Sequence, residues 1–362
     1  MAESVKLKVT DSPEAALKDF LKALLEKEVV KAVLCARPTG SGSITYAMAG
    51  NAGEIDKSSP LAPCMPVNAG TVVSDMTKVQ AFDEPVAAVL RPCETRALVE
   101  LVKLQQASLE NLLIIGLDCY GTYATSDYKK LDSGTVLLED GAENVRAACV
   151  VCEYPVAPVA DIEVGLIGSD PGSEIFLIGK TESGKDALDK AGTGEEGASP
   201  KREAAVEELK KKRVDALQSL VKDIQKEIAG WDGVSTYFAD CINCHNCKTL
   251  CPVCYCRQCF FDSDTLEVEG HRHIAAAQRK GSVRMPDDTM LFHLTRMNHM
   301  GLSCVGCGLC SDACPNDIDV FKVFRTIAHN AQNEFDYVPG LSTEDELPLA
   351  VYREEEFQTI GE

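Results

Sequence analysis

Residues 12–179 alternate between short apolar runs and longer segments with helical periodicity. We predict strands at the apolar runs, which lie at residues 31–36, 86–90, 111–117, 163–167 and 174–178. A helix is predicted from Pro13 onward, because Ser12 can cap its first turn and proline is tolerated at the first helical position. Near-continuous apolar strands separated by helices are typical of an α/β sheet that is buried on both faces.

The pattern changes after this region. Residues 181–200 are rich in Gly, Ser and charge and are predicted to form an exposed loop or linker. A lysine-rich helix is expected at residues 202–228, with one apolar stripe facing the protein. We therefore divide the chain into an α/β domain, a linker with a helix, a cysteine-rich domain and an acidic tail, at residues 1–180, 181–235, 236–335 and 336–362.

Composition places the chain among globular proteins without a membrane span. Of its 362 residues, 45% are hydrophobic and 25% are charged, and no apolar run is long enough to cross a bilayer. The net charge of −20 argues against nucleic-acid binding, because phosphate contacts need a basic surface. The N-terminal residues lack the basic start and apolar core of a secretory signal, so we expect a cytoplasmic protein.

The 17 cysteines stand out, because a chain without an export signal should keep them reduced. Eight of them form two runs with the same Cys-x2-Cys-x2-Cys-x3-Cys-Pro spacing, at Cys241, Cys244, Cys247 and Cys251 and at Cys304, Cys307, Cys310 and Cys314. This is the spacing of bacterial dicluster ferredoxins, in which the fourth cysteine of each run binds the other cluster. The cysteine-rich domain is therefore predicted to be a ferredoxin-like dicluster [4Fe–4S] domain.

The crossing rule assigns the ligands of each cluster. One cluster is expected on Cys241, Cys244, Cys247 and Cys314, and the other on Cys304, Cys307, Cys310 and Cys251. A zinc site is the competing interpretation, but zinc needs only two Cys-x2-Cys pairs, and two matching runs of four exceed that requirement.

About fifty residues separate the two runs, which is more than a compact dicluster domain needs. The insert contains Cys254, Cys256 and Cys259, which we predict to hold a further metal centre with one outside ligand, such as Cys35 or Cys64. The alternative is that these thiols are buried small residues or redox-sensitive bystanders.

Four more cysteines lie in the α/β domain. Cys93 follows one predicted strand, Cys119 ends the next strand, and Cys149 and Cys152 form a Cys-x2-Cys pair. Because the ends of neighbouring parallel strands meet at one edge of the sheet, Cys93 and Cys119 can converge there. With the pair they supply four thiolates, enough for a third [4Fe–4S] cluster.

At these residues the chain resembles the beta-subunit family of coenzyme F420-dependent hydrogenases and dehydrogenases. The matching segments are PVNAGTVVSDM, RPCETRAL, GLDCYG and the Cys-x2-Cys pair followed by ADIEVGLIGS, which together cover roughly residues 67–169. The segment FHLTRMNHMGLSCVGCGLCSDACP resembles the dicluster part of formate dehydrogenase beta-like and heterodisulfide-reductase-associated subunits.

The resemblance implies an α/β flavin-binding domain with a [4Fe–4S] cluster beside FAD, or FMN. It makes Cys93, Cys119, Cys149 and Cys152 cluster ligands, and it places Gly70, Thr71 and Val72 in a turn that contacts the flavin. Arg91, Arg96 or Arg146 would hold a flavin phosphate or stabilise the reduced flavin. No G-x-G-x-x-G follows a strand, so nicotinamide binding of the Rossmann type has no support.

We therefore expect an iron–sulfur flavoprotein subunit of an oxidoreductase complex. A two-electron carrier (F420, NAD(P)H or similar) would meet the flavin, which converts hydride transfer into single electrons. Those electrons would pass through the clusters to or from formate dehydrogenase, hydrogenase or heterodisulfide-reductase-like subunits. Two alternatives stay open, a flavin-free relay of several clusters and a docking subunit whose clusters are structural.

Overall fold

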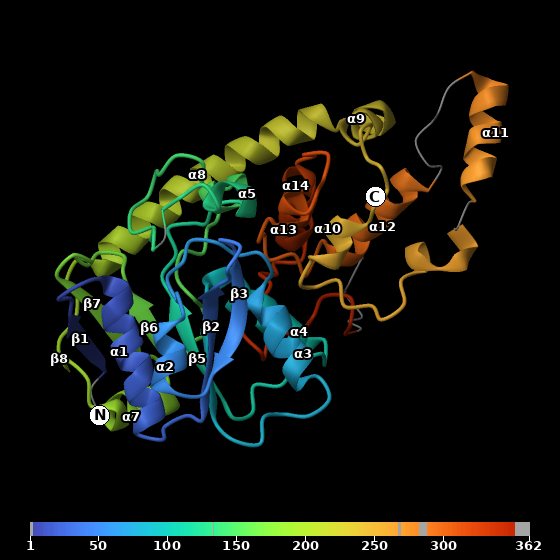
Figure 1. Ribbon diagram of the computed structural model, residues 1–362. Helices are drawn as coiled ribbons and strands as arrows, with labels where there is room; N and C mark the ends of the chain where they lie inside the picture. The colour runs from blue at the N-terminus through green and yellow to red at the C-terminus, as the bar shows by residue number, and fades with distance from the viewer. Residues whose placement is uncertain (1–2, 133, 267–268, 282–287, 352–362) are drawn as a thin grey trace.

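The computed structural model describes residues 3–132, 134–266, 269–281 and 288–351, and a mixed sheet forms its centre (Figure 1). The strand order is β3-β2-β4-β5-β6-β7-β1-β8. Strands β2, β4, β5 and β6 run parallel, and the strands outside them pair antiparallel. The bounds are β1 Ser4–Lys8, β2 Ala32–Pro38, β3 Ile44–Ala49, β4 Val86–Leu90, β5 Leu112–Leu117, β6 Ile162–Gly165, β7 Glu174–Gly179 and β8 Glu195–Glu196.

The five predicted strands correspond to β2, β4, β5, β6 and β7, whereas β1, β3 and β8 were not predicted. The residues of β1 alternate between buried and half-buried positions, so this strand lacks a continuous apolar run. Strand β3 forms a hairpin with β2 at one edge of the sheet and buries only its two end residues. Edge strands are half exposed, which removes the signal that identified the central strands.

Helices cover both faces of the sheet (Figure 1). The helices α1 (Pro13–Glu26), α2 (Ala52–Asp56) and α7 (Glu182–Ala191) lie on one face, and α3 (Ala69–Thr77) and α4 (Pro92–Lys103) lie on the other. Strand β4 shows why its residues are all apolar: Ala87 and Val89 pack into one core, and Ala88 and Leu90 into the other. The predicted α/β sheet with two buried faces is confirmed.

The predicted loop at residues 181–200 is wrong for its first half, which forms α7. The Thr181 hydroxyl caps this helix by accepting a hydrogen bond from the Gly184 N–H (3.0 Å), and Gly192 ends it in a left-handed conformation. Ala187, Leu188 and Ala191 are buried against the sheet. A single short apolar stripe among Gly, Ser and charged residues was too weak a signal to reveal it.

The long helix α8 (Arg202–Glu227) forms where the lysine-rich helix was expected and connects the α/β part to the cysteine-rich part (Figure 1). Its first residue, Arg202, is fastened to the end of β5: Nη2 donates to Oδ1 of Asp118 (2.7 Å), and the guanidinium also pairs with Glu163. Oδ2 of Asp118 accepts from the backbone N–H groups of Leu166 and Ile167 (2.7 Å each).

Short helices make up most of the cysteine-rich part. They are α9 (Gly230–Tyr237), α10 (Asn246–Thr249), the 3-10 helices η1 (Phe260–Asp262) and η2 (Asp264–Leu266), α11 (Gly270–Lys280), α12 (Thr289–Met300), α13 (Leu309–Asp312) and α14 (Val320–Glu334). Helix α14 packs against α8 and α12. Two single-turn helices, α5 (Thr125–Tyr128) and α6 (Ala147–Val150), lie in the α/β part.

The segment after α14 returns to the α/β part, although it was predicted to begin an acidic tail. The Tyr337 hydroxyl donates to Oε1 of Glu100 (2.7 Å), and the Gly340 N–H donates to the same oxygen (2.9 Å). Nε of Arg96 donates to the Pro339 carbonyl (2.9 Å). Residues 337–340 are therefore fixed on α4, and the part of the predicted tail at 352–362 lies outside the described residues.

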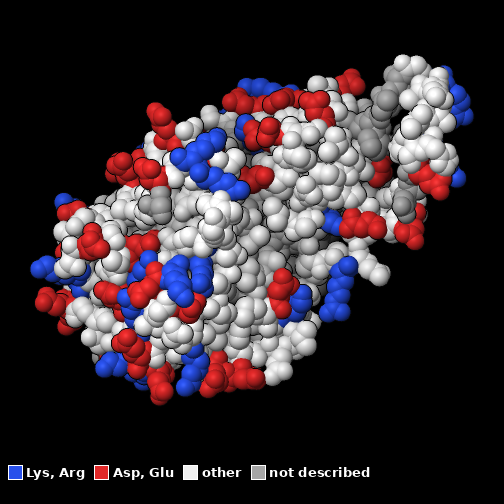
Figure 2. Space-filling view, in the orientation of Figure 1, with Lys and Arg blue, Asp and Glu red and all other residues white. Residues whose placement is uncertain are grey.

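Within the described ranges, no helix combines the length and the apolar character needed to cross a membrane. On the face shown in Figure 2, acidic and basic side chains are interspersed over the α/β part, and no broad basic area is visible there.

The Asp118→Ala substitution is expected to lower the free energy of unfolding by about 3–5 kcal/mol, because a buried ion pair and two backbone donors lose their acceptor. Asp127→Ala removes an exposed pair with Lys130 and is the matched control, with an expected change within about 0.5 kcal/mol. Urea unfolding followed by circular dichroism measures both. Equal effects of the two substitutions would contradict the role of the Asp118 network.

Candidate metal centres

Four cysteines of the α/β part line one cavity, at the end of the parallel strands. Cys93 lies in the first turn of α4 directly after β4, and Cys119 follows β5. Cys149 lies on α6 and Cys152 just after it. The structure therefore brings together Cys93, Cys119, Cys149 and Cys152, from three segments that meet at one edge of the sheet. We call this group the α/β centre.

The two cysteine runs of the C-terminal part form two further cavities, and each run lends its fourth cysteine to the other. One cavity is lined by Cys241, Cys244, Cys247 and Cys314, which we call the Cys241 centre. The other is lined by Cys304, Cys307, Cys310 and Cys251, which we call the Cys304 centre. The structure thus places these eight cysteines together in the crossed arrangement that the spacing predicted.

The two cysteine runs have the same pattern of backbone conformation. The second and fourth residues after the first cysteine have positive φ in each run: Asn243 and His245 (56° and 59°), and Gly306 and Gly308 (71° and 77°). Left-handed residues at these positions curl the loop around a centre and turn backbone N–H groups toward sulfur, as Asn243 N–H does toward Cys241 Sγ (3.4 Å).

The cavities of the α/β centre and the Cys304 centre are adjacent. Gly306 and Cys307 line both cavities, and we call these two residues the shared wall. A Cβ placed on Gly308 would lie only 2.3 Å from the Cβ of Ala148 on α6, so the dicluster loop needs glycine to approach this closely. Nη1 of Arg146 donates to Oδ2 of Asp312 (2.7 Å) across the same contact.

Three buried arginines line the α/β centre: Arg91, Arg146 and Arg213. Nη2 of Arg146 lies 3.8 Å from Cys149 Sγ, and Nη2 of Arg213 donates to the Tyr120 carbonyl (2.9 Å). Cations near thiolates lower the cost of burying negative charge and tune a bound cluster. These arginines are therefore placed to stabilise an anionic centre.

Burial keeps the thiols protonated in the absence of metal. It raises the pKa of Cys119 to about 12 and that of Cys307 to about 12. Binding of iron must therefore displace these protons, and a metal centre offsets the cost of burying thiolates.

The residues fit cubane clusters. In a [4Fe–4S] cube each of the four protein thiolates binds a different iron atom, so no single ion needs three protein ligands. The described residues contain no group of three or more side chains placed to hold one metal ion, which agrees with this requirement. The Nε atoms of Arg213 and Arg296 are buried without a hydrogen-bond partner, and each side chain lines a cysteine cavity. A cluster sulfide or thiolate would give these donors an acceptor.

The flavin positions implied by the resemblance stay a prediction, and the structure shows the protein contacts of each residue. Gly70 lies buried in the first turn of α3, where a Cβ would come within 2.6 Å of the Glu94 carbonyl oxygen, so this glycine serves the packing of α3 on α4. Thr71 and Val72 follow on the same helix and are half-buried. Arg91 lines the α/β centre, where its guanidinium donates to the Tyr46 hydroxyl (3.1 Å) and to the Ala62 carbonyl.

The other two arginines expected at a flavin also have protein partners. Arg146 pairs with Asp312, as described above. Arg96 donates to the carbonyls of Pro339 (2.9 Å) and Val305 (3.1 Å) and lies 3.8 Å above the Tyr154 ring. Both side chains join the two parts of the chain.

The three extra thiols of the insert do not meet the outside ligands proposed for them. Cys35 is buried in β2, paired with Ala47 of β3, and Cys64 is buried in a small core with Ala36 and Ala62. Both belong to the interior of the α/β part, so the prediction that either completes a centre with the insert is wrong.

Burial raises the pKa of the Cys254 thiol in the insert to about 11, and Cys256 is exposed. A metal centre on Cys254, Cys256 and Cys259 stays a prediction.

The sequence analysis missed two buried residues of α12 that touch the cysteines. Nε2 of His293 lies 3.3 Å from Cys241 Sγ, and its ring stacks on Phe238 (3.9 Å between centroids). Burial lowers the pKa of His293 to about 3, so the ring is neutral. Nη1 of Arg296 donates to Cys247 Sγ (3.0 Å). The signal was a histidine and an arginine three residues apart within an apolar helical face.

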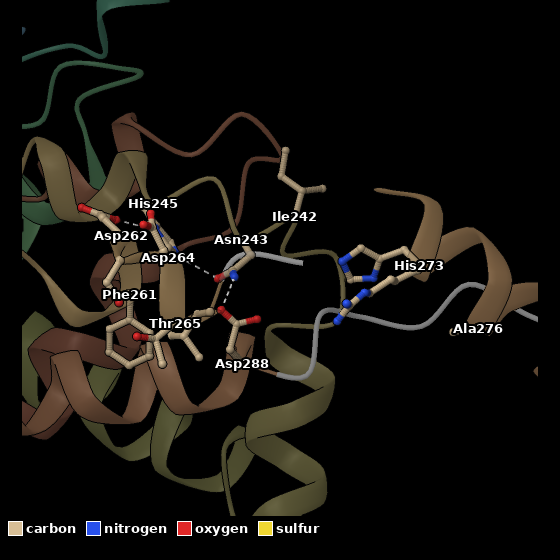
Figure 3. A pocket seen from close by; sticks show the side chains of 13 residues that line it. Ile242, Asn243, His245, Phe261, Asp262, Asp264, Thr265, His273, Ala276 and Asp288 are labelled. Atoms are coloured by element: carbon tan, nitrogen blue, oxygen red, sulfur yellow. Dashed lines mark hydrogen bonds and ion pairs between the residues drawn. The ribbon is translucent and has the colours of Figure 1, made fainter. Parts of the chain in front are cut away.

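An open hollow lies beside the Cys241 centre (Figure 3). Ile242 and His245 line both the hollow and the cysteine cavity. Nδ1 of His245 lies 2.8 Å from Oδ1 of Asp262, and Nδ2 of Asn243 donates to Oδ2 of Asp288 (2.8 Å). The Cys241 centre is therefore separated from this hollow only by its own loop.

Comparison with known proteins agrees with this geometry. The 4Fe-4S binding domain family model matches residues 302–318, which contain the second cysteine run. The F420-dependent formate dehydrogenase subunit beta of Methanocaldococcus jannaschii is 25% identical, over 90% of this chain and 91% of that protein. The F420-dependent formate dehydrogenase 1 subunit beta of Methanococcus maripaludis is 28% identical, over 80% of each chain.

A chain of the F420-reducing [NiFe] hydrogenase complex from Methanosarcina barkeri is a weaker structural match. It has a TM-score of 0.46 and 16% identity, covering 63% of this chain and 93% of that chain. The two formate dehydrogenase subunits match over most of the sequence. Over most of its length the chain is similar to the beta subunits of F420-dependent formate dehydrogenases, and it is an iron–sulfur oxidoreductase subunit.

Proposed function

We propose that the chain conducts single electrons within an F420-dependent oxidoreductase complex, through three [4Fe–4S] clusters bound at the α/β, Cys304 and Cys241 centres. The observation that supports this most strongly is the shared wall of Gly306 and Cys307, which brings the α/β centre against the Cys304 centre. A metal site with a purely structural role would not require such close contact between separate cavities.

The Cys304 centre occupies the middle of the relay. It adjoins the α/β centre through Gly306 and Cys307, and it exchanges its fourth cysteine with the Cys241 centre. The α/β centre and the Cys241 centre have no lining residue in common among the described residues. An electron that enters at one end would therefore cross the Cys304 centre before it reaches the other end.

The chain's own residues prepare the three sites for this role. A bound cubane cluster supplies a one-electron store at each site. All twelve cysteines of the three cavities except Cys244 are buried or half-buried, and Arg91, Arg146 and Arg213 balance negative charge at the α/β centre. Arg146 with Asp312, and Arg325 with Glu153, hold the dicluster part against the α/β part, which keeps the distance between the centres constant.

The proposal also includes a flavin, FAD or FMN. The relatives are named F420-dependent, and a carrier that delivers hydride cannot pass its two electrons directly to one-electron centres without a converter. Gly70, Thr71, Val72 and Arg91 are the candidate flavin contacts; Gly70 is buried between α3 and α4, and Thr71 and Val72 are half-buried. A flavin-free relay, which receives electrons from a partner subunit, is the alternative.

Chemical analysis of anaerobically purified protein tests the number of centres. We expect about twelve irons and twelve sulfides per chain, one cube for each set of four cysteines. The Cys119→Ser variant should lose about four irons and keep the two ferredoxin-type clusters, because Cys119 lines only the α/β centre. Flavin released from the same sample distinguishes the converter from the flavin-free relay.

The control is Cys35→Ala, which removes a cysteine of β2 outside the three cavities and should leave the iron content unchanged. About eight irons in the wild-type chain would contradict the three-centre relay, and about sixteen would add a centre in the insert.

The Gly308→Ala substitution tests the contact between the α/β and Cys304 centres. The added Cβ would clash with Ala148, so we expect a loss of about 1–3 kcal/mol in stability and slower electron transfer between these two centres. Rapid-freeze EPR after mixing with a reductant follows the order and rate of cluster reduction.

Gly42→Ala is the matched control, because Gly42 has a similar positive φ (74°) but no atom within 4 Å of an added Cβ. This substitution introduces only the strain of the left-handed backbone, about 1–2 kcal/mol, and should leave electron transfer at the wild-type rate. An unchanged transfer rate in Gly308→Ala would show that the shared wall does not control communication between the centres.

A further inference from the structure

Arg296 differs from the other buried arginines in its polar partners. The described part of the chain buries Arg91, Arg96, Arg146, Arg213, Arg296 and Arg325. Four of them pair with carboxylates: Arg91 with Glu94, Arg146 with Asp312, Arg213 with Asp140 and Arg325 with Glu153. Arg96 donates to two backbone carbonyls and stacks on a tyrosine. Arg296 is only 4% exposed, and among the described residues no carboxylate forms an ion pair with it, whereas Cys247 Sγ accepts a hydrogen bond from it.

Arg296 lies at both ferredoxin-type centres. Its Nη1 donates to Cys247 Sγ (3.0 Å) and its Nη2 to the Cys247 carbonyl (3.1 Å), on the Cys241 centre. Its side chain also lines the cavity of the Cys304 centre, together with Cys251. Its Nε has no partner at all among the described residues.

Aromatic rings enclose the guanidinium. The Phe292 ring lies 5.4 Å from its central carbon and the Phe324 ring 4.7 Å from it. Phe292 lines the Cys241 centre and Phe324 lines the Cys304 centre, so the cation lies between the two cavities. An arginine enclosed in this way keeps its charge, and it needs nearby negative charge to offset its lost hydration.

A [4Fe–4S] cube with four thiolate ligands is a net anion, and reduction adds one more negative charge. We propose that Arg296 is the shared counter-charge of the Cys241 and Cys304 centres and raises the reduction potentials of both. This inference rests on the proposed function, because it requires clusters at these two centres. The four carboxylate-paired arginines have part of their charge offset by a carboxylate, whereas Arg296 has no carboxylate partner among the described residues and its charge acts on the cysteines of the two centres.

The same observation gives a role to the long insert between the cysteine runs. The insert contains α12, and its buried face includes His293 and Arg296, three residues apart. His293 contacts Cys241, and Arg296 donates to Cys247 and lines the cavity of the Cys304 centre. A compact dicluster domain has no segment that could deliver these side chains. The insert therefore supplies the charge and the hydrogen-bond donors between the two clusters.

The test is an EPR-monitored redox titration of the full chain, purified anaerobically, with the Arg296→Gln variant. We expect the equilibrium constant for reduction to fall at least tenfold at both ferredoxin-type centres, which is ~59 mV for a one-electron couple. The α/β centre should keep its wild-type potential. Arg279→Gln, at an exposed position on α11, is the matched control and should shift none of the three potentials.

The outcomes separate this inference from the proposed function. If wild-type protein lacks the iron for two ferredoxin-type clusters, the proposed function fails. If the clusters are present and Arg296→Gln leaves both potentials unchanged, or shifts only one of them, the shared counter-charge is overturned. If Arg296→Gln cannot retain the clusters, Arg296→Lys decides: a role for charge predicts that lysine retains both clusters, and loss of both would assign Arg296 to packing alone.

Discussion

Burial of several thiolates together is the constraint on which the rest of this structure depends. Each cavity collects four cysteines whose burial disfavours the charged form, so metal and nearby donors must compensate. The groups that compensate the buried negative charge differ between the centres. The α/β centre has arginines that are themselves paired with carboxylates, whereas at the ferredoxin-type centres Arg296 donates to Cys247 and lines the Cys304 cavity. Helices α8 and α12 and the segment at Tyr337 lie where they hold these sites together.

The fold brings the centres together through contacts that are far apart in the sequence. Arg96 of α4 reaches the Val305 carbonyl in the second cysteine run, and Arg146 reaches Asp312. Gly308 permits the closest approach, at Ala148. These contacts make the dicluster part and the α/β part neighbours at the carboxyl end of the sheet, where open α/β proteins usually place their sites. An electron path across this junction therefore follows from the packing.

The central strands and the cysteine groups were predictable from the sequence because their signals are local. An apolar run such as residues 86–90 and a spacing such as Cys304 to Cys314 need no knowledge of distant segments. Helix α7 was missed because its apolar stripe is short, and the packing of Gly70 could not be predicted because it depends on α4, which lies more than twenty residues away. Arg296 could not be identified without the fold, since only the packing of α12 shows that it is buried, donates to Cys247 and lines the Cys304 cavity.

The most direct test of the account is the position of iron in the holoprotein. An anomalous difference map, collected at the iron absorption edge from a crystal grown anaerobically, would locate every cluster independently of activity. The account predicts three strong peaks, one in each cysteine cavity, with the Cys304 peak between the other two. Two peaks without one at Cys93 and Cys119, or a peak at Cys254 in place of one of the three, would contradict it.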